Sequence, residues 1–251
     1  MTVGTDRDVE GLKAIGWVVS TVLRQMLSII EPGMRTVELD EIGARLLEQY
    51  GARSAPRLTY DFPGATCISI NEEAAHGVPG ERVIEPGDVV NVDVSAEKDG
   101  YFADTGGTGV VPPSSPVKDR LLHATRLALD KAVDEARAGH QINRIGRAVE
   151  QVAKQHRFKV IRNLAGHGVG RALHEQPEGI LGYFDRRDQR TLTEGTVIAI
   201  EPFLSTRSTY VEEGSDGWTL CGMQGNLSAQ FEHTLIVTRG RPIVVTAESA
   251  G

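Results

Sequence analysis

Two short segments of the sequence carry an acidic residue in or directly after an apolar run. The segments IEPGDVVNVDV and LTEGTVIAIEP match column by column when their glycines are aligned, and Asp93 then falls on Glu201. Two further acids, Asp104 in YFADT and Glu232 in AQFEHT, end the strand-like segments that follow. Four carboxylates at corresponding places in two similar halves indicate an internal repeat with one shared site.

The geometry of the strands predicts that these acids converge. Side chains alternate along a strand, so Asn91 and Asp93 face one way while the valines of VVNVDV face the other. The pair Asp99-Gly100 is a hairpin signal, which brings the strand of Asp104 back beside that of Asp93. Each close pair of carboxylates costs about 4 kcal/mol at a separation of about 4 Å and an effective dielectric constant of about 20. Any one acid alone is more often a loop cap, but four together require positive charge, which two divalent cations would supply.

Histidines are the expected complement of such a site. His167 and His174 lie seven residues apart in NLAGHGVGRALHEQP, where the density of glycine argues against an ordinary helix and suggests a loop close to a ligand. A lone histidine is usually a hydrogen-bonded core residue, but GHGVG has no core-packing pattern. His76, in NEEAAHGVPG, is the third candidate.

The elements that must position these residues follow from periodicity and from turn signals. The expected helices span residues 8–30, 36–51, 117–138 and 142–157, and the expected strands span 66–70, 88–95, 101–111, 160–164, 196–201 and 229–238. The order is a helix pair with strands, and then a second helix pair with strands. We therefore expect one catalytic domain over residues 1–251, built from pseudo-repeat halves at about 8–112 and 117–240.

Composition narrows the classes of function. The chain of 251 residues is 40% hydrophobic, enough for a large core, and its net charge of −7 disfavours a nucleic-acid partner. The longest apolar-rich segment, residues 14–30, is interrupted by polar residues, and the acidic start is unlike a signal peptide. Two cysteines form no disulfide framework. These features predict a soluble, cytoplasmic protein without a membrane partner, and we expect a monomer.

Five segments together resemble the type I methionine aminopeptidases, which belong to the "pita-bread" metallopeptidases. The segments are CISINEEAAHG, VNVDVSAEKDGYFADT, NLAGHGVGRALHEQP, VIAIEP and DGWTLCGMQGNLSAQFEHT. The resemblance covers nearly the whole chain. It implies an α/β (α+β) pita-bread fold whose two pseudo-symmetric halves, each with a helix pair and antiparallel strands, surround a central dinuclear metal site. The implied metal ligands are Asp93, Asp104, His167, Glu201 and Glu232.

The resemblance also implies an activity: removal of the N-terminal initiator methionine from nascent polypeptides with a small second residue, with the ribosome as a candidate place of action. Glu201 would accept the proton of the attacking water, His174 would stabilise the oxyanion, and His76 would contact the scissile amide nitrogen. The implied substrate pocket is formed by Tyr60, Phe62, Cys67 and Trp218. Carboxylate and imidazole ligands suit Co, Mn, Fe or Zn, so the sequence leaves the metal open.

The sequence departs from the pattern of the family at three places. Phe102-Ala103 and Gly106-Gly107 replace the common His-Gly and Ser-Arg, and Leu173 replaces the commoner aromatic residue before His174. The first two changes are expected to alter metal affinity or loop stiffness while the ligands remain, and the third to widen the pocket.

Two alternative functions share this pattern. Aminopeptidase P and prolidase have the same five ligands, but they usually carry an additional N-terminal domain, for which the residues before residue 8 leave no room. A non-catalytic pita-bread binding protein would have lost ligands, and the retained set of five argues against it.

Overall fold

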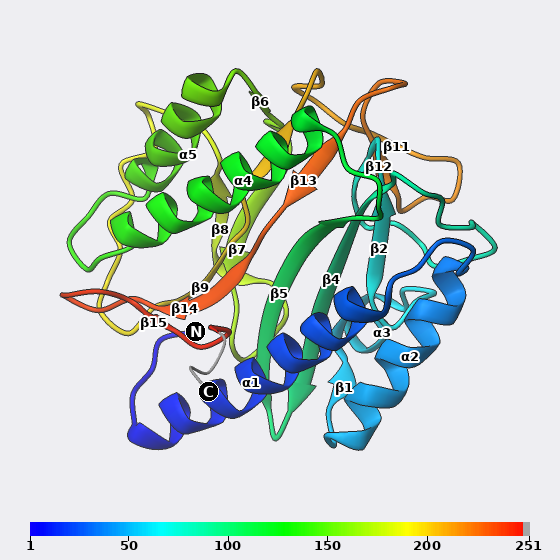
Figure 1. Cartoon of the computed structure of the whole chain (residues 1–251). Coiled ribbons are helices and arrows are strands. Elements are labelled where there is room, and N and C mark those ends of the chain that lie inside the picture. The colour runs from blue at the N-terminus through cyan, green and yellow to red at the C-terminus, as the bar shows by residue number, and fades with distance from the viewer. Residues whose placement is uncertain (248–251) are drawn as a thin grey trace.

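The computed structural model describes residues 1–247 of the chain, and its long helices form two pairs, with a short additional helix beside the first pair (Figure 1). The helices are α1 (Asp6–Ile29), α2 (Thr36–Gln49), α3 (Ala55–Tyr60), α4 (Pro116–Glu135) and α5 (Asn143–His156). The strands are β1 (Arg53–Ser54), β2 (Cys67–Ile70), β3 (Glu73–Ala75), β4 (Val89–Lys98), β5 (Tyr101–Val110), β6 (Lys159–Val160), β7 (Ala165–Gly168), β8 (Glu175–Leu181), β9 (Val197–Ile200), β10 (Phe203–Ser205), β11 (Glu212–Glu213), β12 (Leu220–Cys221), β13 (Ser228–Gln230), β14 (His233–Ile236) and β15 (Ile243–Val244).

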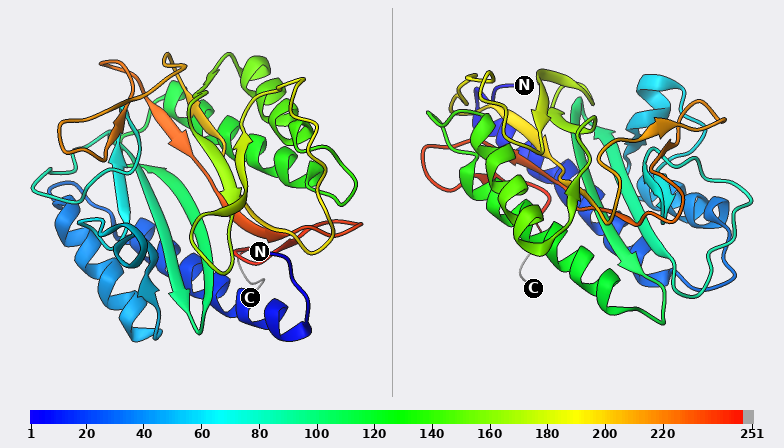
Figure 2. Two further views of the ribbon diagram at one scale, coloured as in Figure 1. Left: turned by 180° about the vertical axis from the view of Figure 1, so that it is seen from behind. Right: turned by 90° about the horizontal axis from the view of Figure 1, so that it is seen from above.

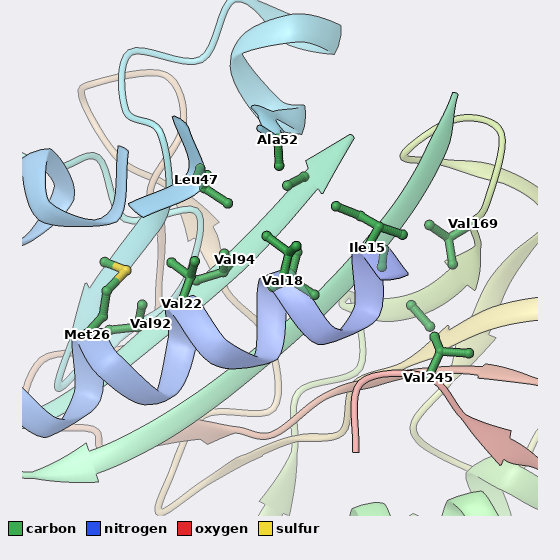
Figure 3. Packing of buried hydrophobic residues seen from close by; sticks show 14 of the residues in the cluster. Ile15, Val18, Val22, Met26, Leu47, Ala52, Val92, Val94, Val169 and Val245 are labelled. Carbon is green, nitrogen blue, oxygen red and sulfur yellow. The ribbon is translucent and has the colours of Figure 1, made fainter. Parts of the chain in front are cut away.

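The sequence of helix α1 determines both where the helix starts and which of its faces packs on the sheet. A capping box starts the helix, since the amide of Asp8 donates to Thr5 Oγ1 and the amide of Thr5 donates to the Asp8 carboxylate. Its apolar residues recur at helical spacing and are buried against β4 and β5 (Figure 3). Complete burial of one such side chain contributes roughly 1.5–3 kcal/mol, so this face anchors the helix on the sheet.

The long hairpin of β4 and β5 carries the first half of the site. Asp99 and Gly100 both have positive φ, as a two-residue hairpin turn requires, and the ladder runs unbroken from Lys98–Tyr101 to Val89–Val110. Val90, Val92 and Val94 are fully buried in the core beneath α1. Alternation therefore turns Asp93 to the opposite side of the sheet, as expected from the sequence.

The second half contains a five-stranded sheet in the order β15-β14-β9-β7-β8. Helices α4 and α5 pack over its apolar face, where Leu129, Ile145, Ile198 and Leu235 belong to one buried cluster. Figure 1 looks onto α1 and α4, whereas the view from behind in Figure 2 looks onto the strands that these helices cover. No helix within residues 1–247 combines the length and apolar character needed to cross a membrane.

The structure corrects three expectations about strands. The predicted strand 229–238 is two strands, β13 and β14, separated at Phe231 and Glu232. The ladder breaks there because the amide of Glu232 donates to the carbonyl of Gly106 on β5. The predicted strand 160–164 shrinks to β6, and His167 lies on strand β7, where a glycine-rich loop was expected.

Candidate metal centre

One cavity of about 540 Å³ gathers all the predicted site residues except Glu232. The residues that line it include Tyr60, Phe62, Cys67, His76, Asp93, Asp104, His167, His174, Glu201 and Trp218. Glu232 lies beneath the others with only 1% of its surface exposed. Residues separated by more than 150 positions in the sequence thus share one site.

Each acid is held by a different part of the strand framework. Asp93 and Asp104 lie on β4 and β5, Glu201 directly follows β9, and Glu232 lies between β13 and β14. His167 lies on β7, paired with Ala199 of β9. The two halves therefore contribute to one centre, and no single segment of the chain could form it alone.

The ligand atoms are close enough to share a cation. Asp104, His167 and Glu232 each offer one donor atom, and these three atoms all lie within 4.8 Å of one another. His167 Nε2 lies 3.8 Å from Asp104 Oδ2 and 3.5 Å from Glu201 Oε1. Oxygen and imidazole donors at these separations suit a divalent transition metal.

The protonation of His167 supports this interpretation. Its Nδ1 lies 2.9 Å from the carbonyl oxygen of Gly168, which can only accept, so Nδ1 carries the proton. Burial, reinforced by the nearby His174 and His76, lowers the pKa of His167 to about 3. The unprotonated Nε2 therefore presents a lone pair to two carboxylates, an arrangement that a cation would make favourable.

The four buried acids would need a counter-charge in order to ionise together. Burial, followed by repulsion between neighbouring acids, holds the pKa values of Asp93, Glu201 and Glu232 well above their ordinary values. Burial raises the pKa of Asp104 to about 6. Within residues 1–247, Asp104 Oδ1 and Glu232 Oε1 are buried without a hydrogen-bond partner. Unpaired buried carboxylate oxygens are costly, and a metal ion would satisfy them.

Two threonines tie the halves together at the centre. Thr234 Oγ1 accepts from the amide of Asp104 at 2.9 Å and donates to its carbonyl at 2.8 Å. Thr105 Oγ1 donates to the carbonyl of Glu232 at 2.9 Å. These bonds fix the backbone of one acid from each half against the other. Neither threonine was predicted from the sequence as a site residue, although Thr105 is adjacent to Asp104 and Thr234 lies two positions after Glu232.

The predicted pocket residues form one wall of the cavity. Phe62 and Trp218 pack edge to face with ring centroids 5.2 Å apart. Tyr60 Oη lies 2.6 Å from His174 Nδ1, and the rings of His174 and His167 lie 4.1 Å apart. His76 adopts a positive φ of 54°, uncommon for a residue other than glycine, where its side chain lines the cavity.

The structure adds wall residues that the sequence analysis missed. Phe203 and Leu220 line the same cavity. Leu173, which was expected from the sequence to widen the pocket, lines it as well. Phe203 follows Glu201 by two positions, so alternation could have placed it on the same side. Nothing local in the sequence indicates Leu220, which reaches the cavity because β12 pairs with β3.

Comparisons with known proteins define the class to which this fold and site belong. Residues 10–239 match the model of metallopeptidase family M24, and the chain belongs to that family. The chain is 46% identical over 247 residues to the methionine aminopeptidase of Staphylococcus epidermidis, with 98% of each chain covered. It is 44% identical to methionine aminopeptidase 2 of Bacillus subtilis, over 98% of this chain and 99% of the relative.

Solved structures agree with this assignment. The methionine aminopeptidase of Thermotoga maritima superposes with a TM-score of 0.94 at 31% identity, covering 99% of this chain and 100% of that one. The prolidase of Pyrococcus furiosus superposes at 0.79 and 22% identity, and this chain covers 66% of it. The second likeness is a likeness of fold alone. The expected pita-bread fold and the expected metallopeptidase family are both confirmed.

Proposed function

We propose that this chain removes the N-terminal methionine from polypeptides by metal-assisted hydrolysis of the first peptide bond. The observation that carries the proposal is a buried group of acids and one neutral histidine beneath a cavity with an aromatic wall. Near-complete coverage by relatives named methionine aminopeptidase supports it.

Asp93, Asp104, His167, Glu201 and Glu232 are proposed to hold two divalent cations. The donor set suits Mn, Fe, Co or Zn, and four carboxylates balance the charge of two such ions. When bound, divalent ions supply Lewis-acid chemistry, which lowers the pKa of water and polarises the substrate carbonyl.

Side chains of the cavity are proposed to transfer the proton, stabilise the oxyanion and contact the scissile bond. Glu201 is proposed to accept the proton of the attacking water and to pass it to the leaving amine. His174 is proposed to donate from Nε2 to the developing oxyanion, with Tyr60 donating to its Nδ1 and thereby setting the tautomer. His76, exposed into the cavity, is proposed to contact the scissile amide nitrogen.

The pocket is proposed to select methionine by shape. Phe62, Cys67 and Trp218 line the cavity, and all three can pack against an unbranched thioether. Methionine sulfur makes favourable contacts with aromatic rings, which suits the Phe62–Trp218 pair. The second side chain of the substrate would lie against the cavity wall, so a small residue is expected there.

A peptide assay tests the proposal. The purified protein is loaded with Mn²⁺ or Co²⁺ and assayed on Met-Ala-Ser and on an Ala-Pro peptide, each with and without chelator. Chelator-sensitive cleavage of Met-Ala-Ser alone is the expected result. Preferential cleavage of Ala-Pro would instead assign an X-Pro peptidase, and cleavage of neither would indicate a non-catalytic member of the fold.

A further inference from the structure

Behind the metal centre, three buried side chains form a chain of hydrogen bonds that ends on Glu232. Asn91 Nδ2 donates to Gln230 Oε1 at 2.9 Å, and Gln230 Nε2 donates to Glu232 Oε2 at 3.0 Å. The exposed fractions are 5% for Asn91, 1% for Gln230 and 1% for Glu232. These hydrogen bonds join β4 of the first half to the break between β13 and β14 in the second half.

The surroundings determine which end of each amide faces which partner. Asn91 Nδ2 lies 3.2 Å from the carbonyl oxygen of Gly107 and 3.3 Å from that of Gln230, and both can only accept. The nitrogen of Asn91 must therefore face them, and the amide oxygen of Gln230 accepts from it. The amide nitrogen of Gln230 is consequently turned towards Glu232.

The two carboxylate oxygens of Glu232 have different surroundings. Oε2 accepts the hydrogen bond from Gln230, whereas Oε1 is buried without a partner within residues 1–247. Glu232 also contributes one donor atom to the compact group with Asp104 and His167. A carboxylate held at one oxygen offers the other in a fixed direction.

We propose that Gln230 is a positioning residue for the metal site. Asn91 fixes the amide of Gln230, and this amide holds one oxygen of Glu232 so that the other oxygen is oriented to bind a divalent cation. The inference rests on the metal site proposed above and concerns the direction and affinity of one ligand. Neither amide titrates, so the donor remains in place at every pH at which the protein is folded.

The Gln230 amide occupies space that is free because Gly106 has no side chain. A Cβ atom at this position would lie 2.1 Å from Gln230 Oε1 and 2.5 Å from Nε2, so any side chain there displaces the amide. The backbone at Gly106 does not have positive φ, so alanine brings no conformational strain. This glycine stands where the family pattern commonly has serine, and the structure shows what its small size accommodates.

The test measures metal affinity, independently of turnover. Metal-free wild type, Gln230→Ala, Gly106→Ala and the double variant are titrated with Mn²⁺ by calorimetry. Loss of a partner that orients a ligand typically weakens metal binding about 10–100-fold, and each single variant should fall in this range. The double variant should be no weaker than Gln230→Ala, because alanine at position 106 acts only by displacing the amide.

Two controls separate positioning from general damage. Gly109→Ala, on the same strand, has only Leu27 Cδ2 at 4.0 Å from its new Cβ, so its Kd for Mn²⁺ should equal that of wild type. Gln230→Met keeps the length of the side chain without the donor and should weaken binding as Gln230→Ala does. The visible spectrum of Co²⁺ should change in the Gln230 and Gly106 variants and stay unchanged in Gly109→Ala.

The outcomes also distinguish this inference from the proposed function. Wild-type Kd values and Co²⁺ spectra in folded Gln230→Met and Gly106→Ala would overturn the positioning role, whatever the peptide activity. Additive losses in the double variant would also overturn it. If the variants lose affinity as expected while wild type fails to cleave Met-Ala-Ser, the positioning role stands and the proposed function falls.

Discussion

Nε2 of His167 lies 3.5 Å from Oε1 of Glu201. His167 lies on β7 and Glu201 directly follows β9, and the pairing of these two strands brings the residues together. The pKa of His167 is lowered and that of Glu201 is raised, both because of burial. Neither group favours the charged form in the metal-free protein. A divalent cation between them would favour neutral imidazole and ionised carboxylate together.

Glu201→Gln and His167→Ala should each abolish peptide cleavage while leaving the fold intact. Both residues are proposed ligands at the cavity wall, and removing either takes away a donor atom without opening the apolar core. Turnover of Met-Ala-Ser at limiting metal, metal content and circular dichroism provide the measurements. Glu10→Gln, on the exposed face of α1, is a matched control and should match wild type. Near-wild-type turnover by either site variant would remove that residue from the ligand set.

Dialysis against chelator should lower the melting temperature, and added metal should restore it. A ligand at 100 times its Kd stabilises the folded state by about 2.7 kcal/mol, which corresponds to roughly 5–10 °C for a chain of this size. Differential scanning calorimetry with and without Mn²⁺ measures the shift. Glu232→Gln should show no such shift, whereas an equal shift in both proteins would mean that the ion binds elsewhere.

The metal-free protein should gain stability from Asp104→Asn at alkaline pH. The pKa of Asp104 is raised from 3.8 to about 6 in the folded state, so its contribution to stability is present below about pH 4 and lost as pH rises through 6. Asparagine does not titrate, so the gain should be on the order of 3 kcal/mol at pH 8 and become small near pH 4. Urea unfolding of both metal-free proteins at these two pH values measures it. An equal difference at both pH values would contradict the assignment.

His174→Ala should lower kcat much more than it changes metal content. His174 lies within hydrogen-bond distance of Tyr60 with its ring tilted against that of His167, and its proposed task is donation to the oxyanion. Loss of one such donor typically costs roughly 10²–10³ in kcat. Tyr60→Phe should reduce kcat less and leave KM nearly unchanged, because it removes only the partner that sets the tautomer. Loss of one metal ion from His174→Ala would reclassify His174 as a ligand.

Selectivity should favour methionine followed by a small residue. Bulky second residues should clash with the cavity wall, and Gly, Ala, Ser or Thr should fit. Discrimination against one methylene is worth only about 1–3 kcal/mol, so norleucine should be cleaved slowly rather than excluded. Values of kcat/KM across a Met-X-Ser series, and for Leu-Ala-Ser and norleucine-Ala-Ser, provide the measurement. A preference for leucine, or indifference to the second residue, would contradict methionine selection and leave the metallopeptidase assignment standing.

The sequence by itself determined the local geometry of the site. Alternation in VVNVDV and the Asp99-Gly100 turn were enough to turn Asp93 away from the core and to place the strand of Asp104 beside it. These features depend on a period of two and on backbone conformation at two residues, which are properties of neighbours in the chain. The five-segment resemblance then identified the family, which the comparisons confirm.

Only the tertiary structure decided how the two halves meet. The break between β13 and β14 exists because the amide of Glu232 pairs with Gly106, more than 120 residues earlier, and not with a neighbouring strand of its own half. The hydrogen bonds from Asn91 through Gln230 to Glu232, and from Tyr60 to His174, likewise join distant segments. Such contacts are selected by the free energy of satisfying buried polar groups in the assembled core, which no local periodicity encodes.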